Sequence, residues 1–148
     1  MLRLAIGKAA AKAHPGEIVL AADTVVVIDG DLLGKPGDPA DARRMLGRIA
    51  GREHTVLTAV ALDEPGQGRH ASAVASSRVR MAALTPEEIA WYVETGEPLD
   101  KAGSYAVQGI GALFVEEVFG NYTNVVGLPL PLTYRLFRQL GYELLDFK

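Results

Sequence analysis

Asp23 interrupts the apolar, β-branched stretch at residues 17–28. A carboxylate inside a buried strand must be hydrogen-bonded, paired with a cation or bound to a metal, because burying it alone is costly. It could activate a water molecule as a general base or hold a hard cation. The alternative is that Asp23 lies where the strand leaves the sheet and only accepts hydrogen bonds from nearby backbone N–H groups. Thr24, its neighbour in the strand, should point to the opposite face.

Two lysines and one amide could complete a site for an anionic ligand. Lys35 lies in a Gly-Lys-Pro-Gly turn, where the flanking residues would hold its ammonium group near a fixed point. A solvated turn lysine is the alternative, since most lysines are exposed, and Lys101 in Asp-Lys-Ala-Gly is equally ambiguous. Gln108 begins Gln-Gly-Ile-Gly, so its amide could meet a nucleobase edge while the glycines admit the ligand.

The composition of the 148 residues excludes several other kinds of site. The chain contains no cysteine, which rules out disulfides, a thiolate nucleophile and a cysteine-type zinc site. Its net charge of −3 gives no basic surface for extended nucleic acid, although a small anion needs only a few cations or a metal. The apolar stretches are too short or too interrupted to span a bilayer, and no signal peptide is visible. We therefore expect a cytoplasmic protein with no membrane or nucleic-acid partner.

The hydrophobic periodicity alternates between strand and helix along one predicted domain, residues 1–148. It predicts helices over residues 2–13, 39–50, 86–94 and 132–140, and strands over residues 17–28, 55–62, 72–81 and 112–119. Residues 97–111 follow neither period, and loops of this length in compact domains are often functional. We expect an α/β fold with a mixed, twisted central sheet, in which the first strand is central. Helices should flank this sheet, and two lobes should enclose a nucleotide cleft.

The order and spacing of short motifs resemble the Maf family of nucleoside triphosphate pyrophosphatases over essentially the whole chain. These motifs are Lys8-Ala9, Ala22-Asp23-Thr24-Val25-Val26, Gly34-Lys35-Pro36, Gly51-Arg52-Glu53-His54 with Thr58, Tyr92-Val93, Thr95-Gly96-Glu97-Pro98-Leu99-Asp100-Lys101-Ala102-Gly103-Ser104-Tyr105, Gln108-Gly109 and Asn124-Val125-Val126-Gly127-Leu128-Pro129-Leu130. Several of them are similar to the subgroup that acts on dTTP and UTP.

The resemblance implies hydrolysis of a nucleoside triphosphate between its α and β phosphates with Mg²⁺ or Mn²⁺. Asp23 would accept a proton from the attacking water or bind the metal. Lys8 and Lys35 would neutralise phosphate charge. The residues implied to bind the substrate or select its base are Thr24, Lys101 and Gln108. The resemblance also implies a homodimer.

One departure from the family pattern leaves alternatives open. Members ordinarily begin with a strand and a Ser-x-Ser-Pro-Arg-Arg segment that binds phosphate, and this sequence lacks it, so we expect a chain truncated at its amino end relative to the family. A nucleotide-binding or regulatory protein with weak or no catalysis, linked to septum formation and cell division, is the second hypothesis. A purely structural domain, in which Asp23 and Lys35 are merely satisfied polar groups, is the third.

Overall fold

The computed structural model describes residues 17–143 and 145, so the helix predicted over residues 2–13, with Lys8, lies outside the described part. Five strands form one sheet in the order β2-β1-β3-β4-β5. They are β1 (Val19–Ile28), β2 (Asp31–Leu33), β3 (Glu53–Glu64), β4 (Arg69–Met81) and β5 (Val115–Phe119). The α-helices described are α2 (Pro39–Ile49), α3 (Pro86–Glu94), α4 (Tyr122–Val126) and α5 (Leu130–Gln139). Short 3₁₀ turns are η1 (Pro65–Gln67), η2 (Glu97–Asp100), η3 (Ala102–Ser104) and η4 (Ile110–Phe114).

Every neighbouring pair of strands in the described sheet is antiparallel, whereas the sequence analysis predicted a mixed sheet. The β1–β2 and β3–β4 pairs are hairpins with short turns, and a parallel pair would need a long crossover. In the first hairpin Asp29 and Gly30 adopt φ values of 52° and 79°, as an Asp-Gly turn requires. The broader prediction of an α/β fold with a central sheet flanked by helices is confirmed.

Two helices begin at side-chain caps. The Asp38 side chain accepts a hydrogen bond from the backbone N–H of Asp41 at 2.7 Å, at the start of α2. Thr85 and Glu88 form a reciprocal capping box at the start of α3. None of the helices in residues 17–143 and 145 combines the length and the apolar character needed to cross a bilayer.

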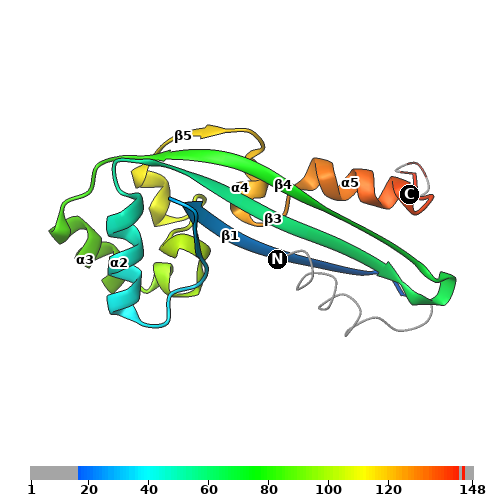
Figure 1. Ribbon diagram of the computed structural model, residues 1–148, viewed down its shortest axis with the longest axis horizontal. Helices are drawn as coiled ribbons and strands as arrows, with labels where there is room; N and C mark the ends of the chain where they lie inside the picture. Colours follow the sequence, from blue (N-terminus) through cyan, green and yellow to red (C-terminus); the bar gives the residue numbers. More distant parts are fainter. Residues whose placement is uncertain (1–16, 144, 146–148) are drawn as a thin grey trace.

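Side chains on one face of the sheet form two separate hydrophobic clusters. Val56 and Val60 of β3 share this face, because they are four residues apart in a strand, yet they belong to different clusters. The first cluster packs α2 and α3 against one end of the sheet, and the second packs α5 against the other end (Figure 1). The buried members of the second cluster are Val60, Leu62, Ala71, Leu136 and Leu140. Burial of apolar surface therefore stabilises two lobes on one sheet.

A polar band separates the two clusters. It consists of Thr24 on β1, Thr58 on β3 and Ser77 on β4. Thr24 and Thr58 are cross-strand partners, and Ser77 pairs across from Val56 on the same face. The side chains of Thr58 and Ser77 are buried, so this is an interior break in the apolar surface. The two-lobe arrangement thus follows from where polar residues fall on three strands.

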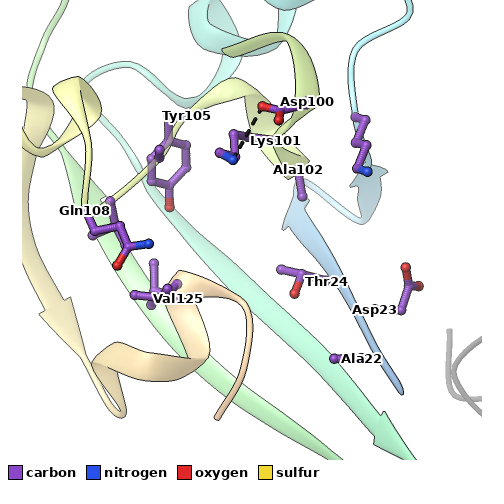
Figure 2. Close-up of a pocket in the computed structure, with 13 residues that line it drawn as sticks. Ala22, Asp23, Thr24, Asp100, Lys101, Ala102, Tyr105, Gln108 and Val125 are labelled. Atoms are coloured by element: carbon purple, nitrogen blue, oxygen red, sulfur yellow. Dashed lines mark ion pairs between the residues drawn. The ribbon is translucent and has the colours of Figure 1, made fainter. Parts of the chain in front are cut away.

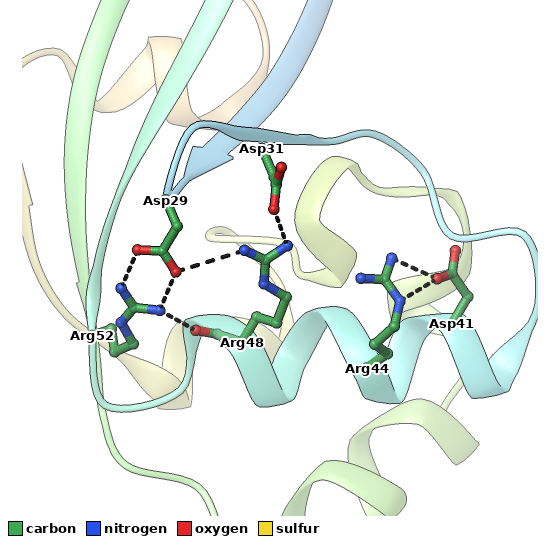
Figure 3. A network of polar contacts seen from close by, with 6 residues as sticks. All are labelled: Asp29, Asp31, Asp41, Arg44, Arg48 and Arg52. Atoms are coloured by element: carbon green, nitrogen blue, oxygen red, sulfur yellow. Dashed lines mark hydrogen bonds and ion pairs between the residues drawn. The ribbon is translucent and has the colours of Figure 1, made fainter.

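Charged side chains fasten the first hairpin to the end of α2 (Figure 3). Arg52 binds the Asp29 carboxylate with both terminal nitrogens, at 2.8 and 2.6 Å. Arg48 lies 2.9 Å from a carboxylate oxygen of Asp31 and 3.6 Å from one of Asp29. The hydrogen bonds from Arg52 hold the pKa of Asp29 below its usual value. We call these four residues the hairpin clasp.

Candidate active site

A cavity of about 260 Å³ lies where the polar band meets the edge of β1. Four segments line it: β1, the turn after β2, residues 100–108 and α4 (Figure 2). The lining residues are Ala22, Asp23, Thr24, Lys35, Asp100, Lys101, Ala102, Tyr105, Ala106, Val107, Gln108, Val125 and Val126. A cavity that combines apolar walls with a few polar groups is typical of a site for a small molecule.

The pairing of β1 explains why the cavity forms at this strand. β2 pairs only with residues 26–28 of β1, so within the described part of the chain residues 19–25 pair with β3 alone. Only the last residues of β1 therefore have a strand on both sides, whereas the sequence analysis expected the strand to be central along its length. An edge of this kind is open to one side, and a single cavity can reach side chains from both faces of the strand.

Asp23 and Thr24 point to opposite faces of β1, as their adjacent positions predict. Thr24 pairs across the sheet with Thr58, and Asp23 pairs with Ala59. Figure 2 shows Asp23 on the far side of the strand from Gln108, with Thr24 between them. The half-buried Asp23 carboxylate and the Thr24 hydroxyl therefore serve different parts of one cavity.

Buried hydrogen bonds orient the Thr24 hydroxyl. Its oxygen lies 2.9 Å from that of Thr58, whose hydroxyl donates to the backbone carbonyl of Asn124 at 3.3 Å. Since Thr58 has one hydrogen to donate, Thr24 must donate to Thr58 when both bonds are made. The Asn124 amide nitrogen in turn donates to the carbonyl of Val56 and to the hydroxyl of Ser77. Thr24 consequently presents acceptor lone pairs to the cavity.

The two predicted lysines of the described chain differ in their surroundings. Lys35 is exposed in the turn after β2 and forms no ion pair with a described residue. The ammonium nitrogen of Lys101 lies 3.4 Å from a carboxylate oxygen of Asp100. An exposed pair of this kind is weak, so an incoming phosphate can compete for Lys101. Both cations can therefore meet an anionic ligand in the cavity.

A buried pair of rings supports the part of the cavity wall that Tyr105 forms. The Nε2 atom of His54 lies 2.6 Å from the hydroxyl oxygen of Tyr105, and the rings meet edge to face. Burial lowers the pKa of His54 to about 4, so the imidazole is neutral at pH 7. His54 therefore supports Tyr105 as a neutral, buried side chain.

The cavity gathers all the predicted site residues that the structure describes, while Lys8 lies outside the described residues. These are Asp23, Thr24, Lys35, Lys101 and Gln108. Sequence reasoning missed the wall formed by Tyr105, Val125 and Val126 as part of the site. An aromatic residue inside the aperiodic segment 97–111 was an available signal for the first of these. No sequence period distinguishes the two valines of α4.

Among the described residues, no group of three or more histidine, aspartate or glutamate side chains is placed to hold a metal ion. Asp23 and Asp100 are the carboxylates that line the cavity. Magnesium sites that handle nucleotides often use only one or two carboxylates, with substrate phosphates and water as the other ligands. The residues present therefore fit a metal that is shared with a nucleotide.

Comparison with known proteins identifies the family. Residues 1–140 match the family model described as "Maf-like protein". The chain belongs to the Maf family.

Several relatives in the Maf family share half of their aligned residues or more with this chain, and each is named dTTP/UTP pyrophosphatase. The relative from Anaeromyxobacter sp. (strain Fw109-5) is 54% identical over 144 residues, covering 95% of this chain and 70% of the relative. The relative from Symbiobacterium thermophilum is 51% identical, covering 96% and 73%. The relative from Gloeobacter violaceus is 53% identical, covering 91% and 71%.

Proposed function

We propose that this Maf protein hydrolyses dTTP and UTP between the α and β phosphates, releasing the nucleoside monophosphate and pyrophosphate. The observation that carries the proposal is the similarity to relatives named for this activity, which extends over more than nine tenths of the chain. The cavity supports it, because it contains the carboxylate, ammonium, hydroxyl and amide groups that such a reaction can use.

The pyrimidine base would occupy the part of the cavity that contains Gln108 and Thr24. An amide both donates and accepts, which suits the carbonyl oxygen and the N3–H of uracil or thymine. The Thr24 hydroxyl donates to Thr58, so its oxygen is a second acceptor that the same N3–H could use. Tyr105 and Val125 provide apolar surface beside these groups. Cytosine has an acceptor at N3 and would fit this pattern less well.

The triphosphate would extend toward Asp23 and Lys35. We propose that Asp23 accepts the proton of a water molecule whose oxygen bonds to the α phosphorus. The bond from that phosphorus to the α–β bridging oxygen breaks, and its electron pair leaves with pyrophosphate. Lys35 and Lys101 would neutralise charge on the leaving group. Lys8, which lies outside the described residues, keeps the phosphate-binding role that the family resemblance implies.

A divalent metal ion, Mg²⁺ or Mn²⁺, is the proposed cofactor. Asp23 would hold it together with phosphate oxygens of the nucleotide, since these are the hard oxygen ligands that both ions prefer. When bound, the ion would supply positive charge against the triphosphate. We also propose a cytoplasmic homodimer, as the resemblance implies. Half-exposed Trp91 on α3 supplies apolar surface that a dimer contact could use.

The purified protein should release pyrophosphate from dTTP and UTP in the presence of Mg²⁺, with at least roughly tenfold lower kcat/KM for dCTP. A coupled pyrophosphate assay measures this directly. Binding of dTTP without release of pyrophosphate would refute the proposal and support the non-catalytic alternative. That alternative is not favoured, because the relatives are named for a catalysed reaction.

A further inference from the structure

Glu97 lies outside the main cavity but holds the loop that carries Gln108. Its carboxylate accepts hydrogen bonds from the Tyr92 hydroxyl at 2.5 Å, from the backbone N–H of Ile110 at 2.8 Å and from that of Gly111 at 2.9 Å. The Tyr92 hydroxyl oxygen also accepts the backbone N–H of Ala106 at 3.1 Å. We call Glu97 and Tyr92 the loop clamp. The loop clamp is hydrogen-bonded to residues 106–111 at both ends, at Ala106 and at Ile110 and Gly111, and Gln108 lies between these contacts.

The glycines of this loop make room for the loop clamp. A Cβ atom at Gly109 would lie 2.0 Å from a carboxylate oxygen of Glu97. One at Gly111 would lie 2.5 Å from the carbonyl oxygen of Ala106 and 2.6 Å from the hydroxyl of Tyr92. The sequence analysis expected these glycines to admit a ligand, but the space beside them is filled by the clamp. The Gln-Gly-Ile-Gly pattern is therefore a requirement of loop positioning.

The protonation states of the two side chains match these roles. Burial raises the pKa of the Tyr92 phenol, and its hydrogen bond to Glu97 raises that pKa further, so the phenol remains a donor. Burial raises the pKa of Glu97, but the hydrogen bonds from Tyr92 and from two backbone N–H groups outweigh this and hold it below its usual value. An ionised carboxylate receiving three hydrogen bonds is a strong anchor.

We propose that Glu97 and Tyr92 are positioning residues that determine which pyrimidine is accepted, by fixing where the Gln108 amide meets the base. This inference rests on the proposed function of the same cavity. Neither side chain of the loop clamp lines the cavity, so both act through the backbone of residues 106–111. Recognition by paired hydrogen bonds requires the amide to be held within about half an ångström of its place. Loosening the loop should thus weaken discrimination between bases more than it slows the reaction at Asp23.

The test compares Glu97→Gln with wild type for dTTP and dCTP, using both kinetics and calorimetric binding. The glutamine side chain keeps the shape of glutamate but turns an amide NH₂ group toward one of the three donors. At least one hydrogen bond to the loop clamp is therefore lost. We expect KM for dTTP to rise roughly tenfold, kcat to change less than about threefold, and the preference for dTTP over dCTP to fall roughly tenfold. Glu94→Gln, at the exposed end of α3, is the matched control and should leave all three values unchanged.

Tyr92→Phe removes the hydroxyl that contacts Glu97 and the Ala106 N–H but keeps the ring in the core. It serves as the second variant if Glu97→Gln does not fold. It should lower the preference for dTTP by a smaller factor than Glu97→Gln. An unchanged preference in both folded variants, with only a lower unfolding midpoint, would overturn the inference. Wild type that binds dTTP without releasing pyrophosphate would refute the proposed function, and the ratio of dissociation constants would then decide the inference. Absence of any nucleotide binding would refute both.

Discussion

The hairpin clasp and the cavity use similar charged residues in opposite ways. In the clasp, Arg48 and Arg52 are matched by Asp29 and Asp31 at hydrogen-bonding distances. In the cavity, Lys35 has no ion-pair partner among the described residues, and Lys101 has only an exposed one. Charges that satisfy one another can hold a turn but cannot bind much else. The cavity instead keeps its cations available, as a site for an anionic ligand requires.

Removing the carboxylate of Asp23 should have the largest effect on activity and so distinguish the cavity most clearly from the hairpin clasp. Asp23→Asn preserves shape but cannot accept a proton, and loss of a general base costs about 100-fold to 10,000-fold in rate. We expect kcat for dTTP to fall by that factor while dTTP binding persists. Coupled pyrophosphate release and calorimetry measure the two effects.

Asp63→Asn is the matched control. Asp63 is also half-buried and lies on the same face of the sheet as Asp23, on β3 opposite Val19 of β1. It should retain full activity. If the two variants were equally active, Asp23 would not be the base, and its place in the cavity would need another explanation.

Replacing Lys35 should affect activity and spare stability. Lys35→Ala removes an exposed cation with no ion pair to a described residue, so the unfolding midpoint should not change. Loss of one charge-assisted contact to phosphate should lower kcat/KM roughly 10-fold to 100-fold, and Lys35→Arg should recover part of it. Steady-state kinetics and thermal unfolding test this together. A destabilised variant with normal kcat/KM would show that Lys35 stabilises the fold, as the clasp residues do, and does not bind substrate.

The buried His54 should make stability depend on pH. Its pKa is about 4 in the folded protein and 6.5 ordinarily, so the unfolded chain binds more protons between these values. Stability should therefore fall as pH drops from about 6.5 to about 4, by about 3 kcal/mol in total. Denaturant unfolding of wild type and His54→Gln across this range isolates the contribution. The exposed His70 is the control, and His70→Gln should keep the wild-type slope.

The smallest effect should come from the hairpin clasp itself. Arg52→Ala breaks two exposed hydrogen bonds to Asp29, and such surface pairs contribute little. We expect a small fall in the unfolding midpoint with kcat and KM for dTTP unchanged. A large loss of activity would show that the clasp and the cavity are coupled. It would contradict the separate roles assigned to the two regions.

Features specified by neighbouring residues could be predicted from the sequence. The Asp29-Gly30 turn and the Thr85 capping box are of this kind, because each depends on residues no more than three apart. Five cavity residues were also predicted, but their roles depended on a family resemblance. The loop clamp could not be predicted, since Glu97 binds backbone N–H groups 13 and 14 residues away, and backbone groups leave no pattern in a sequence.

The two-lobe arrangement depends on alternation along paired strands. Thr24 and Thr58 are ordinary strand residues when each is considered alone. Only the register that places them opposite each other turns them into a polar band between two cores. Two lobes were predicted, but not that this polar register divides them. The antiparallel order of the described sheet was not predicted, because the pairing of β1 with β3 joins strands separated by α2.

Hydrolysis of dTTP in water labelled with heavy oxygen tests the central claim most directly. The proposal that Asp23 activates water for attack at the α phosphorus predicts that the label appears in thymidine monophosphate and not in pyrophosphate. Mass spectrometry of the two products distinguishes these outcomes. Label in pyrophosphate, or release of inorganic phosphate with thymidine diphosphate, would contradict the account.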